Sequence, residues 1–145
     1  VVNPSAADGS LDLLPEFRQR HQVIAVIGSR HATEEVSLRI LQELPANVSE
    51  IVSGGAEGVD KAAEDIAAAL SLPLRRFLPN YERYGKRAPL MRNLEIIAYA
   101  DEVLAFWDGS SRGTMHSVAE CIRSGKPVRV VPFFPDAVGA SSPTE

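Results

Sequence analysis

Two glycine-containing stretches carry the residues of this chain that are best suited to hold an anion. The first, residues 53–60, has adjacent glycines at 54 and 55, a third at 58 and an aspartate at 60. It follows a short β-branched run and precedes an alanine-rich segment, which is typical of a strand, a tight turn and a helix start. The second stretch covers residues 108–114. Such turns present backbone N–H groups to a phosphate, and glycine lets a ligand approach the backbone closely.

The first stretch is not diagnostic alone, because it is neither a Walker loop nor a spaced G-x-G-x-x-G. Its meaning depends on the elements that position it. Apolar runs predict five strands, at residues 23–27, 50–53, 73–78, 102–107 and 127–131. Strands that alternate with helices favour an α/β fold: a doubly wound parallel five-stranded sheet of order 3-2-1-4-5, with helices on both faces.

Four helices are expected between these strands. The first begins at Thr33 as its N-cap and ends before Pro45, and the second covers residues 59–71. The third starts at residue 88 or 89, after a loop over residues 80–89. The fourth ends at Gly125 and has an apolar stripe formed by Met115, Val118, Ala119 and Ile122.

This strand order places the topological switch between the first and fourth strands, where ligands of such sheets bind. Asp60 is interpreted first as a helix N-cap and second as a ribose ligand, and the arginines suit forked contacts to phosphate. The predicted ligand-binding residues are Gly28, Ser29, Arg30, Ser53, Gly54, Gly55, Gly58, Asp60, Arg92, Asn93, Asp108, Gly109, Ser110, Arg112, Gly113 and Thr114.

Composition narrows the classes of protein. The 145 residues carry a net charge of −4, which argues against a general nucleic-acid coat, yet residues 74–92 hold six basic side chains against one acid. No run of about 18 apolar residues predicts a membrane span. The single Cys121 fits a reducing compartment, so a cytoplasmic location is expected. No His, Cys, Asp or Glu cluster has metal-ligand spacing.

We expect an N-terminal extension over residues 1–21, one domain over 22–134 and a disordered tail over 135–145.

With these residues in place, the chain resembles the SLOG superfamily, which joins DprA (Smf) to the Lonely Guy enzymes. It looks closest to the small YspA- and YpsA-related bacterial proteins. The likeness covers Val23 to about Pro132. It rests on residues 26–30, residues 53–60 with Ala63, Arg92-Asn93, residues 105–109 with 111–114, and residues 125–128. The resemblance implies a Rossmann-like domain that binds a nucleotide or nucleotide derivative as a homo-oligomer, either a dimer or a tetramer.

Two departures from the family patterns bear on function. Lonely Guy enzymes cleave a nucleotide N-glycosidic bond with P-G-G-x-G-T-x-x-E and an upstream arginine. Arg92 and Gly113-Thr114 match, but Ser117 stands at the glutamate position and cannot supply a carboxylate. DprA usually places arginine where Glu57 stands, and an acid there weakens contact with a DNA backbone.

The sequence therefore favours binding of a small nucleotide-derived molecule, as a sensor or carrier, with AMP, ADP-ribose or an NAD-like nucleotide as the bound group. Nucleic acid and membranes are not expected partners. Two alternatives stay open. One is N-glycosidic hydrolysis, with Arg92 orienting the phosphate and Asp108 or Glu120 as acid or base. The other is DprA-like binding of single-stranded DNA.

Overall fold

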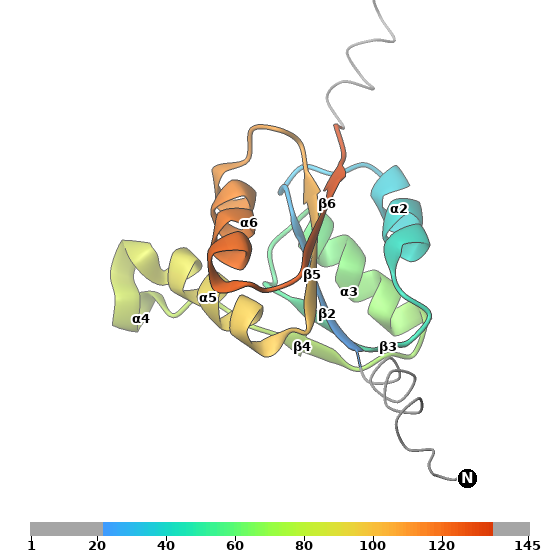
Figure 1. Ribbon diagram of the computed structural model, residues 1–145, viewed down its shortest axis with the longest axis horizontal. Coiled ribbons are helices and arrows are strands. Elements are labelled where there is room, and N and C mark those ends of the chain that lie inside the picture. The colour runs from blue at the N-terminus through green and yellow to red at the C-terminus, as the bar shows by residue number, and fades with distance from the viewer. Residues whose placement is uncertain (1–21, 135–145) are drawn as a thin grey trace, which may run out of the picture.

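A five-stranded parallel sheet forms the centre of the molecule, with helices on both faces (Figure 1). The computed structural model describes residues 22–134, so the extension and tail expected at the two ends lie outside the described residues. The strands are β2 (Gln22–Gly28), β3 (Val48–Ser53), β4 (Leu74–Arg76), β5 (Glu102–Trp107) and β6 (Val128–Pro132). The helices are α2 (Glu35–Glu43), α3 (Val59–Ala69), α4 (Tyr81–Tyr84), α5 (Ala88–Tyr99) and α6 (Arg112–Ser124), with a 3₁₀ turn η1 (Gly85–Arg87).

The strand order is β4-β3-β2-β5-β6, and every neighbouring pair is parallel. This confirms the predicted order 3-2-1-4-5. The central strand β2 pairs on one side with β3, where Ile24 lies opposite Ile51, and on the other with β5, where it lies opposite Glu102. The carboxyl ends of β2 and β5 therefore lie side by side at the topological switch.

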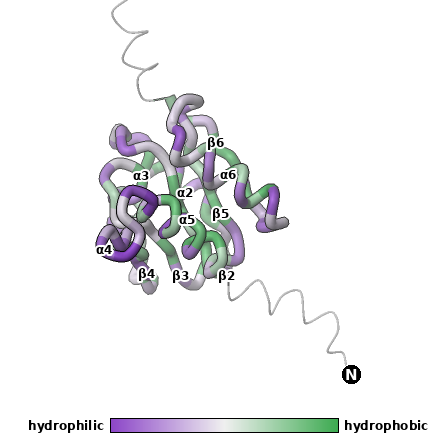
Figure 2. The backbone as a smooth tube through the Cα atoms, turned by 90° about the vertical axis from the view of Figure 1, so that its left-hand side faces the viewer, coloured by the Kyte–Doolittle hydropathy of each residue, from purple (hydrophilic) through white to green (hydrophobic). Residues whose placement is uncertain are grey.

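Alternate residues of the strands pack into two separate cores. Ile24, Val26 and Ile51 face α2 and α3, while Ala25, Ile27 and Val52 face α5 and α6. This two-residue alternation follows from the pleat of a strand, and because helices cover both faces, the central strands β2 and β5 are nearly continuous apolar runs. Figure 2 shows the hydrophobic strands inside the fold and a hydrophilic α4 at its side.

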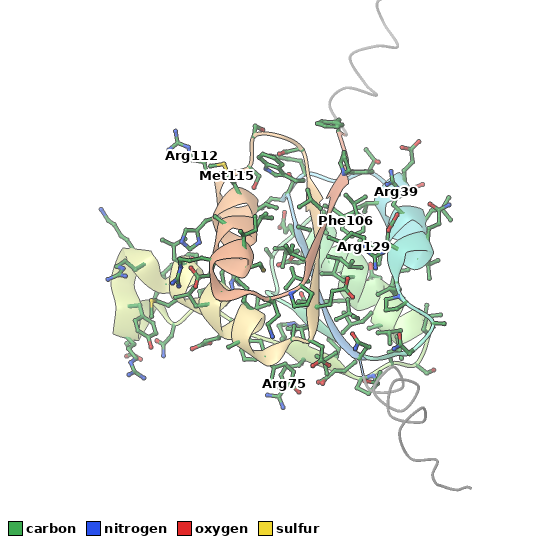
Figure 3. The ribbon with its side chains drawn as sticks, viewed as in Figure 1. Arg39, Arg75, Phe106, Arg112, Met115 and Arg129 are labelled. Carbon is green, nitrogen blue, oxygen red and sulfur yellow. The ribbon has the colours of Figure 1, made fainter. Side chains whose placement is uncertain are left out.

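Two helix details differ from expectation. Helix α2 has Glu34 rather than Thr33 as its N-cap, and Thr33 contributes through its carbonyl, which accepts the Val36 N–H at 3.0 Å. Helix α6 packs through Thr114, Ser117 and Cys121. Of the expected stripe, Val118 packs against the core, whereas Met115 is 52% exposed and Ile122 70% exposed (Met115 is labelled in Figure 3). Small side chains let α6 approach the sheet closely. The end of α6 at left-handed Gly125 is confirmed.

Residues 80–89 were expected to form a loop, and this expectation is wrong. They fold into α4 and η1, which lead directly into α5 and lie at one side of the sheet (Figure 1). The Asn80 side chain caps α4, because its carbonyl oxygen accepts the Arg83 N–H at 3.0 Å. Pro89 lies in the first turn of α5, as predicted. Across residues 22–134, no helix combines the length and apolar character that a membrane crossing needs.

Candidate functional site

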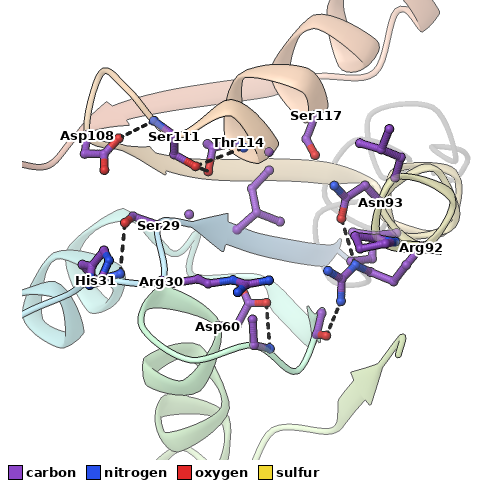
Figure 4. Close-up of a pocket in the computed structure, with 18 of the residues that line it drawn as sticks. Ser29, Arg30, His31, Asp60, Arg92, Asn93, Asp108, Ser111, Thr114 and Ser117 are labelled. Atoms are coloured by element: carbon purple, nitrogen blue, oxygen red, sulfur yellow. Dashed lines mark hydrogen bonds between the residues drawn. The ribbon is translucent and has the colours of Figure 1, made fainter. Parts of the chain in front are cut away.

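A pocket of about 430 Å³, here called the inner pocket, opens at the carboxyl ends of β2 and β5 (Figure 4). Its walls come from the β2–α2, β3–α3 and β5–α6 loops and from α5. Eleven predicted ligand-binding residues line it: Gly28, Ser29, Arg30, Gly54, Asp60, Arg92, Asn93, Asp108, Ser110, Gly113 and Thr114. The structure thus brings together three loops that lie far apart in the sequence.

A second cavity of about 390 Å³, the outer pocket, adjoins the first. The two share Arg30, Gly54, Ala56 and Arg92 as lining residues. The outer pocket is otherwise lined by Gly55, Glu57, Leu78, Pro79 and Tyr81. The two arginines therefore stand at the boundary between the cavities.

Arg92 is held in place by the loop it faces. Its guanidinium donates from Nη1 to the carbonyls of Gly54 and, at 3.3 Å, Phe77, and from Nε to the Asn93 side chain at 2.9 Å. A Cβ on Gly54 would lie 2.7 Å from Arg92 Nη1 and 2.9 Å from an Asp60 oxygen. Burial lowers the pKa of Arg92, and the negative charge of Asp60 opposes this shift. A side chain at position 54 would therefore displace the Arg92 guanidinium or the Asp60 carboxylate.

Gly58 joins two loops. Its φ of +78° is favourable only for glycine, and a Cβ there would overlap the backbone carbonyls of Ser29 and Arg30. The Val59 N–H donates to the Ser29 carbonyl at 3.0 Å and fixes the same junction. Gly58 positions Arg30 rather than offering open space to a ligand.

Ser53 lies beneath the pocket and does not line it. Its hydroxyl donates to Glu64 at 2.9 Å and accepts the Gly55 N–H at 3.0 Å, while Arg76 forms a two-pronged pair with Glu64 at 2.8 and 2.9 Å. The positive charge of Arg76 is therefore paired with a carboxylate, and Ser53 shapes the glycine loop.

The β5–α6 loop is ordered by Asp108. One carboxylate oxygen accepts the N–H groups of Ser110 at 2.9 Å and Ser111 at 2.8 Å. These backbone bonds lower the pKa of Asp108. Ser111 then caps α6, because its hydroxyl contacts Thr114 Oγ1 at 3.0 Å and accepts the Thr114 N–H at 3.4 Å. The N-terminus of α6, positive through its dipole, thus faces the pocket.

Asp60 is not the N-cap of α3, which corrects the first interpretation of this residue. The cap is Gly58, and Asp60 lies in the first turn with its carboxylate accepting the Ala56 N–H at 3.2 Å. Burial raises the pKa of Asp60, although the Ala56 bond and the charge of Arg92 oppose the shift. The side chain fixes the glycine loop from the pocket floor.

Four further predicted residues lie outside the inner pocket. Gly55 lines the outer pocket, Gly109 lies beside Phe134, and Arg112 points away from the sheet (Figure 3). Glu120 pairs with Arg123 and lines a separate cavity against α5. Of the two carboxylates considered for hydrolysis, Glu120 is therefore remote, and Asp108 is held by backbone N–H groups.

Sequence reasoning did not assign eight lining residues to the pocket: Ile27, His31, Ala56, Pro89, Leu90, Ile96, Ser111 and Ser117. Two had a readable signal. Ser111 stands three residues before Thr114 at a helix start, which is the spacing of a side-chain cap, and His31 follows Arg30 directly after a strand. Among the described residues, no group of three or more His, Cys, Asp or Glu side chains is placed to hold a metal ion.

Comparison with known proteins places this geometry in a family. The sequence model of DNA recombination-mediator protein A matches residues 8–80. The chain is 37% identical over 84 residues to the gene 61 protein of Mycobacterium phage D29, which covers 54% of this chain and 67% of that protein.

Two solved structures share the fold. DNA processing protein A (DprA) from Streptococcus pneumoniae superposes with a TM-score of 0.64 at 19% identity, over 81% of this chain and 52% of that one. DNA processing protein A from Helicobacter pylori, whose structure describes a single-stranded DNA binding mode, gives 0.62 at 25% identity, over 81% and 69%. The chain spans only about half of the first of these proteins.

These matches overturn two predictions made from the sequence. The small nucleotide-derived ligand and the exclusion of nucleic acid are both wrong, because the matched family and structures are proteins of DNA processing. The net charge of −4 misled because it averages the whole chain, whereas the pocket boundary carries Arg30 and Arg92. Glu57, the other argument against DNA, lines the outer pocket and not the inner one.

The DprA part of the resemblance is confirmed, while the closeness to YspA-related proteins stays a prediction. The family match covers half of the chain, and the phage relative is matched over two thirds of its length. The chain belongs to the DNA recombination-mediator protein A family.

Proposed function

We propose that this chain binds single-stranded DNA at the inner pocket. The observation that carries the proposal is that the family match covers residues 8–80, which include Ser29, Arg30, Gly54 and Asp60 of the pocket wall. The single-stranded DNA binding mode described for the Helicobacter pylori protein supports it. The fuller activities of these longer relatives are not assigned to this chain.

A backbone phosphate would lie between Arg30 and the start of α6. Arg30 is exposed, and no ion pair or side-chain hydrogen bond engages it within residues 22–134. Opposite it, Ser111, Gly113 and Thr114 line the start of a 13-residue helix, whose dipole favours an anion. These groups contact only the backbone, so they bind DNA without reading its sequence.

The recessed shape favours a single strand over a duplex. Flexible single strands place phosphates and splayed bases into separate pockets, which paired and stacked bases cannot do. We therefore expect affinity for duplex DNA to be lower at the same salt concentration.

Fluorescence anisotropy with a labelled oligothymidylate tests this function. We expect Arg30→Ala to weaken binding by about 10- to 150-fold, because a charge-assisted contact to phosphate is worth roughly 1.5–3 kcal/mol. Arg123→Ala is the matched control, since Arg123 is an exposed arginine that pairs with Glu120 away from the pocket. Equal binding by wild type and Arg30→Ala, or no binding by the wild type, would contradict the proposal.

Three earlier expectations remain proposals beside this one. The resemblance supports a homo-oligomer, and light scattering of the purified chain would measure its mass. A cytoplasmic location and a bound nucleotide cofactor also stay untested predictions. Neither is needed for the DNA contacts described above.

A further inference from the structure

The phosphate contacts proposed above leave the outer pocket unused. It is open beside Arg30 and Arg92, and its far wall is formed by Leu78, Pro79 and Tyr81. Tyr81 is 58% exposed and Leu78 is 62% exposed, although both are large apolar side chains. An aromatic ring and an aliphatic side chain lining one cavity suit a flat, partly apolar group.

Tyr81 is anchored next to the arginine at the pocket boundary. It is the first residue of α4, which the Asn80 cap fixes to the end of the β4 connection. Tyr81 and Arg92 line the same cavity, so the ring and the guanidinium face one space. The ring is thus held at the same boundary that a bound strand would cross.

Glu57 adds an acceptor to this cavity. It is exposed, and no ion pair holds it among the described residues, although Arg30 and Arg92 line the same pocket. A carboxylate repels phosphate but accepts hydrogen bonds from base edges. Guanine offers two neighbouring donors, N1–H and the N2 amino group. Thymine offers a single N–H between two carbonyl oxygens.

We propose that the outer pocket is a base-binding subsite, in which Tyr81 stacks on one base and Glu57 selects guanine over thymine. This inference rests on the proposed binding of single-stranded DNA. The strand crosses at Arg30 and Arg92, with a phosphate in the inner pocket and a neighbouring base in the outer one. Stacking tolerates any base, so the preference for guanine comes from the carboxylate.

Anisotropy titrations with two labelled strands of equal length test the subsite: an oligothymidylate and an alternating guanine–thymine strand. We expect Tyr81→Ala to weaken binding of both by about 5- to 150-fold, the loss typical of one stacked base. Tyr81→Phe keeps the ring and should bind as the wild type does. Tyr84→Ala removes a ring from the same helix outside the pocket and is the matched control.

Glu57→Gln separates base selection from simple repulsion. If Glu57 reads guanine, this change abolishes the wild-type preference for the guanine-containing strand, because an amide presents a donor beside its acceptor. If Glu57 only repels phosphate, the change strengthens the binding of both strands equally and overturns the guanine assignment.

Loss of binding in Arg30→Ala together with unchanged binding in Tyr81→Ala would overturn the stacking subsite and leave the proposed function standing. A wild type that binds neither strand would remove the function itself.

Discussion

Arg30 and Arg92 lie at the same pocket boundary but are engaged differently. Arg92 donates to the Gly54 and Phe77 carbonyls and to Asn93, so much of its hydrogen-bonding capacity supports the protein. Arg30 is exposed at the end of β2 and has no such partners among the described residues. An arginine that stabilises a loop and an arginine that binds a ligand cannot be distinguished by residue type, because both use the same planar donors.

Asp108 makes stability depend on pH in a predictable direction. Backbone N–H groups lower its pKa in the folded protein, so its contribution is present above the unfolded value of about 4 and is lost as the pH falls through the folded value. We expect Asp108→Asn, which keeps the acceptor oxygen but removes the charge, to lower the free energy of unfolding at neutral pH. The difference from wild type should vanish in acid. Urea denaturation at a series of pH values measures both.

Asp65→Asn is the control for that series, since Asp65 is an exposed aspartate whose carboxylate contacts Lys61 at 3.0 Å on the surface of α3. Such surface pairs contribute little, so this variant should follow the wild type. A constant stability loss in Asp108→Asn at every pH would mean that the loop does not hold a charged carboxylate.

At the scale of elements, one glycine determines how two loops meet. Gly58 and Gly85 share a backbone conformation, with φ and ψ of 78° and −124° against 58° and −134°. A Cβ on Gly58 would overlap the Ser29 and Arg30 carbonyls, whereas a Cβ on Gly85 meets nothing within 4 Å. We expect Gly58→Ala to lower the free energy of unfolding by roughly 1–3 kcal/mol more than Gly85→Ala does. Thermal denaturation of both variants measures the difference, and equal losses would contradict the loop junction.

The strands were predictable because both sheet faces are covered. A strand that is buried on both faces is a continuous apolar run, such as residues 23–27, and the run alone identifies it in the sequence. The observed bounds of β5 are the predicted ones. The segment before α5 was missed because two tyrosines, several charges and Gly85 give weak helix propensity. Its signal was local: Asn80 caps the Arg83 N–H. A helix of four residues is too short to show a helical period of apolar residues, so its cap is the signal that the sequence carries.

At the scale of the whole molecule, topology predicted where the candidate residues meet but not what they hold. Strand order 3-2-1-4-5 brings Ser29, Gly54 and Thr114 to one edge whatever their side chains do there. Whether the site suits DNA or a small ligand depends instead on which basic side chains already pair with carboxylates of the protein. Arg75 and Arg76 belong to the basic stretch at residues 74–92, yet each lies beside a glutamate. Such ion pairs form only in the folded protein, so a net charge summed over the sequence does not reveal them.

The dependence of DNA binding on salt measures how many phosphates the molecule engages. Single-stranded DNA gives a slope of about −0.7 in log K against log salt for each phosphate neutralised by Lys or Arg. With Arg30 and Arg92 as the cations at the pockets, we expect a slope of about −1.4, and a reduction of about 0.7 in Arg30→Ala. Anisotropy titrations over a range of salt concentrations measure both values.

Arg83, Lys86 and Arg87 are the alternative source of phosphate contacts, because they lie exposed on α4 and η1 outside both pockets. If the strand continues over them, the slope approaches about −3.5, since three more phosphates are neutralised. Replacing all three by alanine would then reduce the slope by about 2.1, while leaving the loss caused by Arg30→Ala intact. A shallow slope unaffected by this triple change confines the strand to the two pockets, and a steep slope that it abolishes would extend the interface along α4.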